Sequence, residues 1–157
     1  MPITPLHFGL MAPITSIWPN RISWVSFALT NIWIDALAIL AVVSGDPLPG
    51  HDEWGHTFVG ATLIAVMVGV FGIRSWPWVL GAFLGAWSHI VLDMLVHKDI
   101  EPLRPMIAGN PFYLGIMEPL SWALIPFTVW FIAQTVSSGM AMTRKLLMRA
   151  RHLHNRL

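Results

Sequence analysis

The residues best suited to chemistry lie in the segment SHIVLDMLVHKD, where His89, Asp93 and His97 are spaced four residues apart. In an α-helix, residues four apart lie about 40° from one another around the axis, so the three side chains would share one face. Imidazole nitrogens and carboxylate oxygens are common ligands of divalent metals, and His89 and Asp93 could hold one cation together. This spacing therefore predicts a metal site on one helix face.

The rest of the chain is strongly apolar. Of its 157 residues, 55% are hydrophobic and only 11% are charged, whereas a soluble domain carries about 25% charged residues. A chain this short cannot bury so much apolar surface in its own core, so we expect a bilayer around it. The net charge of +1 argues against a nucleic-acid partner, and the absence of cysteine leaves histidines and carboxylates as the metal ligands.

Four stretches are long enough to cross a bilayer, which takes about 20 apolar residues. We therefore predict an all-α fold, a polytopic membrane helix bundle with four long spans at residues 22–43, 56–73, 78–97 and 119–140. A shorter membrane segment, residues 4–18, precedes them and should fold back against the first span. Residues 1–142 would form the membrane-embedded helical domain with an outward-facing polar site, and residues 143–157 a basic cytoplasmic amphipathic tail.

The basic residues fall mostly at one set of helix ends. Lys98 and Arg104 alone lie at the opposite ends. The positive-inside rule places the larger set in the cytoplasm: Arg21, Arg74, Arg144, Lys145, Arg149, Arg151 and Arg156. We therefore expect the C-terminus in the cytoplasm and the polar site toward the outer side.

Counting residues from the predicted inner turns brings five polar side chains to a similar depth. At a helical rise of about 1.5 Å per residue, His7 and Asp35 would each lie about 21 Å above the first inner turn. His56, His89 and Asp93 would lie about 22–28 Å above the second inner turn. Ionisable groups in lipid are costly, so their convergence on one layer indicates a functional site.

These five side chains are the candidate ligands of one or two divalent metal ions, with zinc favoured by the imidazoles. A bound metal would acidify a water molecule and polarise a phosphoryl or acyl oxygen. We assign proton transfer to His97 or Asp99, and binding of an anionic headgroup to Lys98 or Arg104. An outer-leaflet site predicts a lipid or lipid-linked substrate.

Several of these motifs together resemble a known family. The opening MPITPLH, Asp35 late in the first long span, the HTF after a short loop, and WSHIVLDMLVHKDIEPLRP are similar to the membrane-bound metal-dependent hydrolases. That group is related to the LexA-binding, inner-membrane-associated hydrolases. The resemblance covers roughly residues 1–115, and its most specific part is SHxxxDxxxHxD. It implies a hydrolase of the bacterial inner (plasma) membrane whose polar positions are His7, Asp35, His56, His89, Asp93, His97 and Asp99.

The resemblance is incomplete at one position, and one of its motifs is also similar to a motif of a second family. Where the family often carries a Pro-Asp pair, this chain has Asn31 and Asp35. The HxxxD element is also similar to one in zinc-dependent phospholipases C, which implies phosphoester chemistry.

Two alternatives are not enzymes. The first is a transporter, because buried aspartates and histidines also line proton, ion or metal pathways. A pathway would have to continue to the inner side, but the lower halves of two spans, LIAVMVGVFGI and WVLGAFLGAW, contain no ionisable residue. A scaffold for a partner membrane protein would keep the polar cluster for interhelical hydrogen bonds and would bind no metal. The sequence leaves open whether four further residues join the site: His51, Asp52, Glu53 and Glu118.

Overall fold

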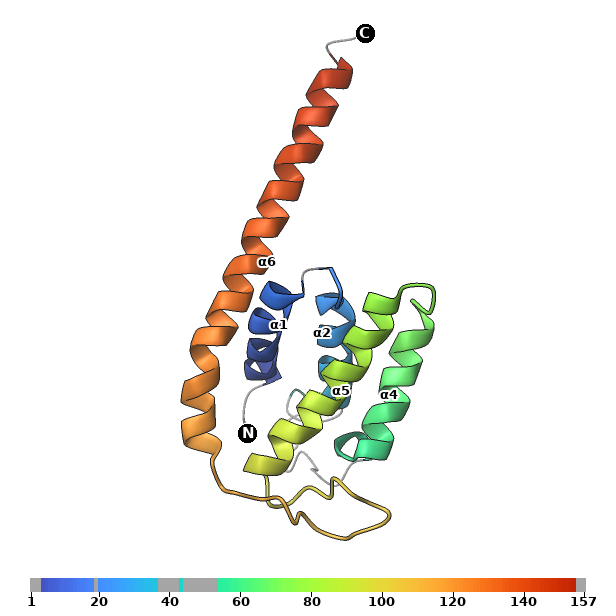
Figure 1. Ribbon diagram of the computed structural model, residues 1–157, viewed down its shortest axis with the longest axis vertical. Helices are drawn as coiled ribbons and strands as arrows, with labels where there is room; N and C mark the ends of the chain where they lie inside the picture. The colour runs from blue at the N-terminus through green and yellow to red at the C-terminus, as the bar shows by residue number, and fades with distance from the viewer. Residues whose placement is uncertain (1–3, 19, 37–42, 44–53, 155–157) are drawn as a thin grey trace.

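The computed structural model describes residues 4–18, 20–36, 43 and 54–154, and all the regular structure in these residues is helical (Figure 1). The predicted all-α fold is confirmed for this part of the chain. The elements in chain order are η1 (Thr4–Leu10), α1 (Met11–Ile17), α2 (Trp24–Ile34), η2 (Trp54–His56), α4 (Phe58–Val70), α5 (Trp76–Val96) and α6 (Met117–His154).

Two helices in the described residues, not four, are long and apolar enough to cross a bilayer. They are α5 and, within α6, the stretch Met117–Ser138. The expectation of four long spans is wrong here because α2 has 11 residues and α4 has 13. At about 1.5 Å per residue these helices reach about 17 and 20 Å, short of a hydrocarbon core of about 30 Å. The later part of the predicted span 22–43 falls on residues 37–42, outside the described residues.

Helices α2 and α5 pack closely because α5 presents glycines to α2. The sequence GAFLG places Gly81 and Gly85 one turn apart, a spacing that lets helix backbones approach each other. A Cβ atom added at Gly85 would lie 2.6 Å from the Phe27 carbonyl oxygen. At the start of the two helices, Ser26 Oγ donates a hydrogen bond to the carbonyl of Trp78 (2.7 Å). The close contact fixes the height of the α2 C-terminus along α5.

On its other side α5 packs against α4. The shared core consists of small and branched apolar side chains: Ile34, Ala61, Ile64, Ala65, Val68, Ala82, Ala86 and Ile90. Trp78 Nε1 donates to the carbonyl of Val68 (2.8 Å), which ties the end of α4 to the start of α5. As a result α5 lies between α2 and α4, and the buried part of its length faces both.

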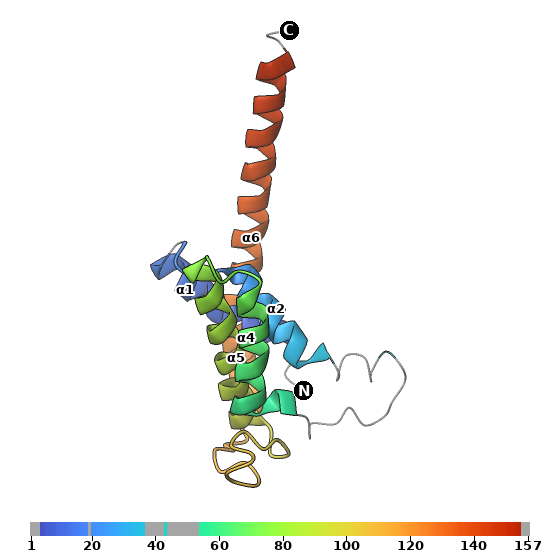
Figure 2. The same ribbon diagram turned by 90° about the vertical axis from the view of Figure 1, so that its right-hand side faces the viewer.

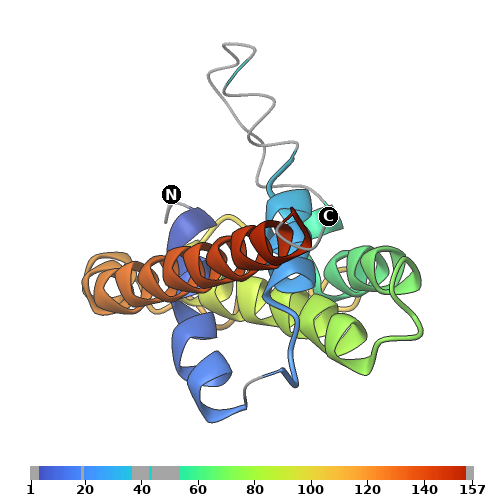
Figure 3. The ribbon, with the colours of Figure 1, turned by 90° about the horizontal axis from the view of Figure 1, so that it is seen from above.

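The N-terminal segment packs mainly against α6, with smaller contacts to α2 and α5. Its predicted partner was the first long span, so the main partner differs, although the segment does return into the bundle. Gly9 permits the close approach, since a Cβ there would lie 2.8 Å from Thr128 Oγ1 and 2.9 Å from the Leu124 carbonyl. Seen from above, α6 and α4 lie on opposite sides, with η1 and α1 beside α6 (Figure 3).

The two ends of the bundle differ in what they carry. The turn between α4 and α5 and the connection between α1 and α2 lie at the end from which the long α6 projects (Figures 1 and 2). The segment joining α5 to α6, residues 97–116, lies at the opposite end. Residues 143–154 of the predicted tail continue α6 without a break.

Candidate metal centre

Helix α5 carries two of the candidate residues on its buried face. His89 and Asp93 stand four residues apart, so their side chains point to the same side of the helix. Both are buried, and His89 has no exposed surface. The helix ends at His97, whose backbone N–H donates to the Asp93 carbonyl (2.8 Å). Helix α5 and the residue that ends it therefore position three of the candidate residues: His89, Asp93 and His97.

Asp35 reaches the site from the end of α2. It is the residue that terminates the helix, and its backbone N–H donates to the carbonyl of Asn31 (3.3 Å). Because α2 packs tightly on α5, this terminus lies beside the buried face of α5. The Asp35 side chain is 15% exposed, which is more than the side chains of His56 (4%), Asp93 (6%) and His89 (0%).

His56 comes from the short helix η2, directly before α4. Thr57 Oγ1 donates to the carbonyl of Trp54 (2.8 Å), and the N–H of Phe58 donates to the carbonyl of Pro102 (2.9 Å). The first bond closes η2 on itself, and the second joins α4 to the segment that follows α5. Together they hold the buried His56 ring at the same height as the end of α2.

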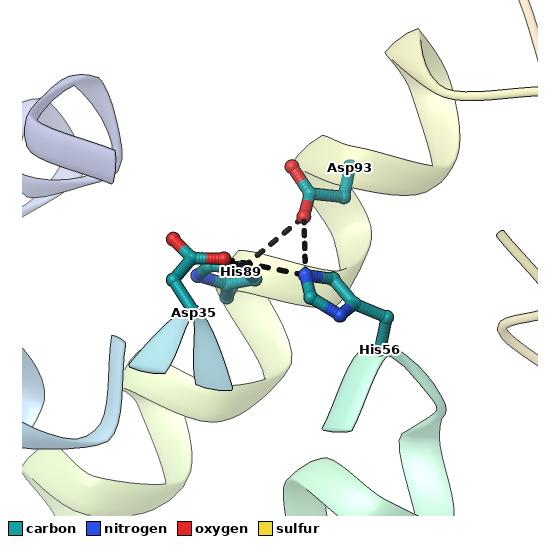
Figure 4. A group of neighbouring side chains, drawn as sticks. All are labelled: Asp35, His56, His89 and Asp93. Carbon is teal, nitrogen blue, oxygen red and sulfur yellow. Dashed lines mark hydrogen bonds and ion pairs between the residues drawn. The ribbon is translucent and has the colours of Figure 1, made fainter. Parts of the chain in front are cut away.

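The four side chains converge, and Figure 4 shows them pointing toward one another. Each offers one ligand atom, and these atoms all lie within 4.8 Å of one another. His89 Nε2 lies 3.1 Å from Asp93 Oδ2 and 3.4 Å from Asp35 Oδ1. His56 Nε2 lies 3.6 Å from Asp93 Oδ2 and 3.3 Å from Asp35 Oδ1. The predicted convergence is confirmed for these four residues.

The spacing of the four atoms fits a single metal ion. Two ligands with bonds of about 2.0–2.1 Å to a tetrahedral zinc lie about 3.3–3.4 Å apart. The four nitrogen–oxygen distances run from 3.1 to 3.6 Å, on either side of that value. Two imidazoles and two carboxylates are also a donor set that zinc accepts.

Asn31 fixes the orientation of His89. The Nδ2 atom of Asn31 donates to the carbonyls of Phe27 (2.9 Å) and Gly85 (3.3 Å), so the oxygen of its amide points the other way. That oxygen lies 3.1 Å from His89 Nδ1, which must carry a proton to bond with it. In the neutral ring the lone pair is then on Nε2, the atom that faces the two carboxylates.

This tautomer is the arrangement that a metal ligand needs. Among the described residues, His89 Nε2 makes no hydrogen bond of acceptable geometry, although it is buried and close to two carboxylates. A lone pair and two carboxylates repel one another unless a proton or a metal ion lies between them. In metal sites the second ring nitrogen of a histidine ligand is commonly held by an outer hydrogen bond, and Asn31 would supply that bond if His89 binds a metal.

His7 lies beside the group of four. Its ring stacks on that of His89, with centroids 4.3 Å apart and planes at 10°. Its Nε2 lies 3.2 Å from Asp93 Oδ1, the carboxylate oxygen that points away from His56 and His89. His7 is buried, and η1 carries it into the site from the side of α6. Its predicted role as a ligand stays a prediction.

The other predicted residues lie toward the 97–116 segment. His97 is buried, with Nε2 4.0 Å from Asp93 Oδ1 and Nδ1 4.0 Å from Asp99 Oδ1. Asp99 is 59% exposed, and Lys98 is exposed. The Arg104 guanidinium lies 3.4 Å from Glu101 Oε2 and stacks over the ring of Trp54 at 5.9 Å. The catalytic and substrate-binding roles of these residues stay predictions.

Sequence reasoning did not assign Asn31 to the site. Its one signal was its position four residues before Asp35, which places both on one face of α2. Three of the four residues that the sequence left open, His51, Asp52 and Glu53, lie outside the described residues. Glu118 is exposed in the first turn of α6 and is not in the group of four.

Comparisons of the chain with protein-family models, with curated proteins and with solved structures found no match. The resemblance to the membrane-bound hydrolases therefore stays a prediction from the motifs, and the site has to be interpreted from its geometry.

Proposed function

We propose that this protein is a membrane-embedded metal-dependent hydrolase. The observation that carries the proposal is the buried group of Asp35, His56, His89 and Asp93, whose four nitrogen–oxygen distances of 3.1–3.6 Å bracket the ligand spacing of a tetrahedral zinc. They come from three separate elements, and Asn31 selects the His89 tautomer that binds a metal.

Exposed apolar surface supports the membrane part of the proposal. Only 17% of the most apolar stretch within α6 is buried by the rest of the chain. Its exposed side chains include Trp122, Val129 and Ile132, each more than half exposed. An apolar surface of this extent is stable against lipid and is a liability in water. We place the end of the bundle that carries residues 97–116 on the outer side, as the basic residues predict.

Zinc is the metal we propose for the group of four, because two imidazoles and two carboxylates suit it. When bound, zinc would acidify a water molecule and polarise the oxygen of the bond to be cleaved. Zinc sites can expand to five ligands, so four protein ligands leave room for that water. Asp35, the most exposed of the four, marks the side from which water would enter.

Proton transfer falls to the residues that lead from the site to the surface. His97 contacts Asp93 through Nε2 and Asp99 through Nδ1, each at 4.0 Å. Asp99 is exposed, so a proton released in the buried site could pass to it and then to solvent. His97 or Asp99 is therefore the acceptor that we propose.

The substrate we propose is a lipid or lipid-linked ester or phosphoester of the outer leaflet. Lys98 and Arg104 are exposed at the end of the bundle nearest the site, where they could hold an anionic headgroup. Exposed apolar residues lie on the same segment, among them Met106 (74%) and Leu114 (64%). A segment with both kinds of side chain suits the boundary between headgroups and acyl chains.

Metal analysis of the purified protein tests the proposal. After incubation with zinc and removal of free metal, the wild-type protein should retain zinc and hydrolyse bis-p-nitrophenyl phosphate or p-nitrophenyl acetate. Asp93→Asn should lower zinc affinity by about 100-fold or more and abolish hydrolysis. The change removes the negative charge of the carboxylate whose Oδ2 lies beside both His56 and His89. Glu118→Gln, which changes an exposed acid outside the group, should leave both unchanged.

Two results would overturn the proposal. A wild-type protein that binds no zinc would make the scaffold interpretation the better one. Zinc binding with no hydrolysis, combined with zinc uptake into vesicles that contain the protein, would indicate a transporter.

A further inference from the structure

The Asp93 carboxylate presents its two oxygens to two different sets of nitrogens. Oδ2 faces His89 Nε2 at 3.1 Å and His56 Nε2 at 3.6 Å, within the group of four. Oδ1 faces His7 Nε2 at 3.2 Å and His97 Nε2 at 4.0 Å. All four histidines are buried, and the Asp93 side chain is only 6% exposed. A carboxylate arranged in this way can bridge two cations.

The distances around Oδ1 are compatible with a second metal ion. Two ligands with bonds of about 2.0–2.1 Å lie about 2.9 Å apart at a right angle and about 4.1 Å apart when opposite each other. The distances of 3.2 and 4.0 Å from Oδ1 to His7 and His97 both fall within this range. The two contacts place Asp93 Oδ1 beside a nitrogen of each histidine.

The stacking of His7 on His89 supports the same arrangement. The two rings are nearly parallel, and their centroids lie 4.3 Å apart. Each ring directs its Nε2 toward a different oxygen of Asp93. Stacking suits neutral imidazoles, the form in which histidine binds metal, whereas two imidazolium rings would repel each other.

Asp99 completes the surroundings of His97. Its Oδ1 lies 4.0 Å from His97 Nδ1, the ring nitrogen that does not face Asp93. A carboxylate on the outer nitrogen of a histidine ligand orients the ring and increases its basicity. Asp99 is therefore an ion-pair partner for the outer nitrogen of His97, at a longer distance than the 3.1 Å hydrogen bond from His89 to Asn31.

We propose that His7, His97 and Asp93 Oδ1 form a second divalent-metal site, with Asp93 bridging it to the first. This inference rests on the proposed function, since it assumes a metal in the group of four. Three protein ligands leave a position open for water or a substrate oxygen, as in catalytic zinc sites.

A bridged pair of metals favours phosphoesters as the substrate class. Two ions about 3.5–4 Å apart can contact both the attacking and the leaving oxygen of an in-line displacement at phosphorus. Hydrolysis would form a bond from a water oxygen to phosphorus and break the bond from phosphorus to the ester oxygen. The water proton passes to solvent, and the leaving oxygen takes up a proton from solvent.

Metal stoichiometry tests the second site without relying on activity. Protein stripped with a chelator is titrated with Co²⁺, and the metal bound per chain is measured by absorbance and by elemental analysis. We expect two equivalents for the wild type and one for His7→Gln and for His97→Gln, each checked for an unchanged thermal midpoint. His152→Gln, which alters a histidine in the projecting part of α6, should still bind two.

The outcomes separate the two proposals. One equivalent in the wild type, unchanged in the His7 and His97 variants, would overturn the second site and leave the proposed function standing. No bound metal in the wild type would overturn both. A wild type that binds two equivalents but favours p-nitrophenyl acetate over bis-p-nitrophenyl phosphate would overturn the phosphoester assignment.

Discussion

Single hydrogen bonds decide whether the residues of this site can bind a metal. A histidine is a ligand only through an unprotonated nitrogen, so the tautomer matters as much as the position of the ring. Asn31 makes that selection for His89, since both of its hydrogen bonds to carbonyls require its nitrogen and leave its oxygen for Nδ1. A neutral amide thus controls the chemistry of the charged residues around it.

Replacing Asn31 should therefore weaken metal binding without removing a ligand. Asn31→Leu keeps a branched side chain, although a larger one, and loses the acceptor for His89 Nδ1, so the ring can rotate or change tautomer. We expect zinc affinity to fall by about 10–100-fold, the usual cost of losing an outer hydrogen bond to a ligand. Competition with a chromophoric chelator measures it.

Thr30→Val is the matched control for Asn31→Leu. Thr30 is equally buried on α2 and donates to the Ser26 carbonyl (2.9 Å), but it does not contact the site. Its replacement should leave zinc affinity unchanged. Equal losses of affinity in the two variants would mean that Asn31 acts through stability alone.

The sequence predicted the charged and titratable residues of the site better than the neutral one. His89 and Asp93 were found because spacing of four on a helix places them together, and Asp35 and His56 because charge in an apolar chain is costly. Asn31 is uncharged, and amides in apolar helices serve many structural purposes. Its role depends on the carbonyl of Gly85, 54 residues away, which no local pattern reveals.

At the scale of helices, the site depends on how closely α2 approaches α5. Gly85 makes this contact, and it lies one turn from His89. A Cβ there would lie 2.6 Å from the Phe27 carbonyl and 3.1 Å from Asn31 Nδ2. The added atom would therefore push against the same backbone that positions Asn31 and Asp35.

Gly85→Ala should destabilise the protein and weaken the site together. We expect a loss of about 1–3 kcal/mol in the free energy of unfolding from overpacking, and weaker zinc binding as α2 moves away. Gly69→Ala is the matched control on α4, since a Cβ there meets nothing within 4 Å. It should stabilise the helix by up to about 1 kcal/mol. Thermal unfolding in detergent micelles measures both, and equal midpoints for the two variants would contradict this account.

Helix lengths were harder to predict than helix positions. The apolar stretch 56–73 has the composition of a spanning segment, but Thr57 has an extended backbone and its hydroxyl accepts the N–H of Gly60. That cap starts α4 at Phe58 and leaves His56 in a separate short helix. Hydropathy averages over such a cap, so composition alone overestimated the length of the span.

At the scale of the whole molecule, the site and most of the basic residues lie toward opposite ends. Arg21 and Arg74 precede α2 and α5 at the end from which α6 projects, whereas Asp35, His56 and His97 lie toward the 97–116 segment. The depth count from the sequence correctly grouped Asp35, His56, His89 and Asp93 because the rise of a helix is constant. It could not show that η1 reaches the site along α6, since that packing depends on the fit of Gly9 against Thr128.

The orientation of the chain in the membrane can be tested directly because the chain contains no cysteine. Two single-cysteine variants place a thiol at each end of the molecule: Met106→Cys in the segment after α5, where the side chain is 74% exposed, and Met148→Cys in the projecting part of α6, where it is 58% exposed. The positive-inside rule puts residue 106 outside and residue 148 in the cytoplasm, because five of the basic residues follow residue 143.

In intact spheroplasts, a membrane-impermeant maleimide should label Met106→Cys and should label Met148→Cys only after detergent is added. Labelling of Met148→Cys alone in intact spheroplasts would reverse the orientation. The site would then face the cytoplasm, and its substrate would have to be sought in the inner leaflet.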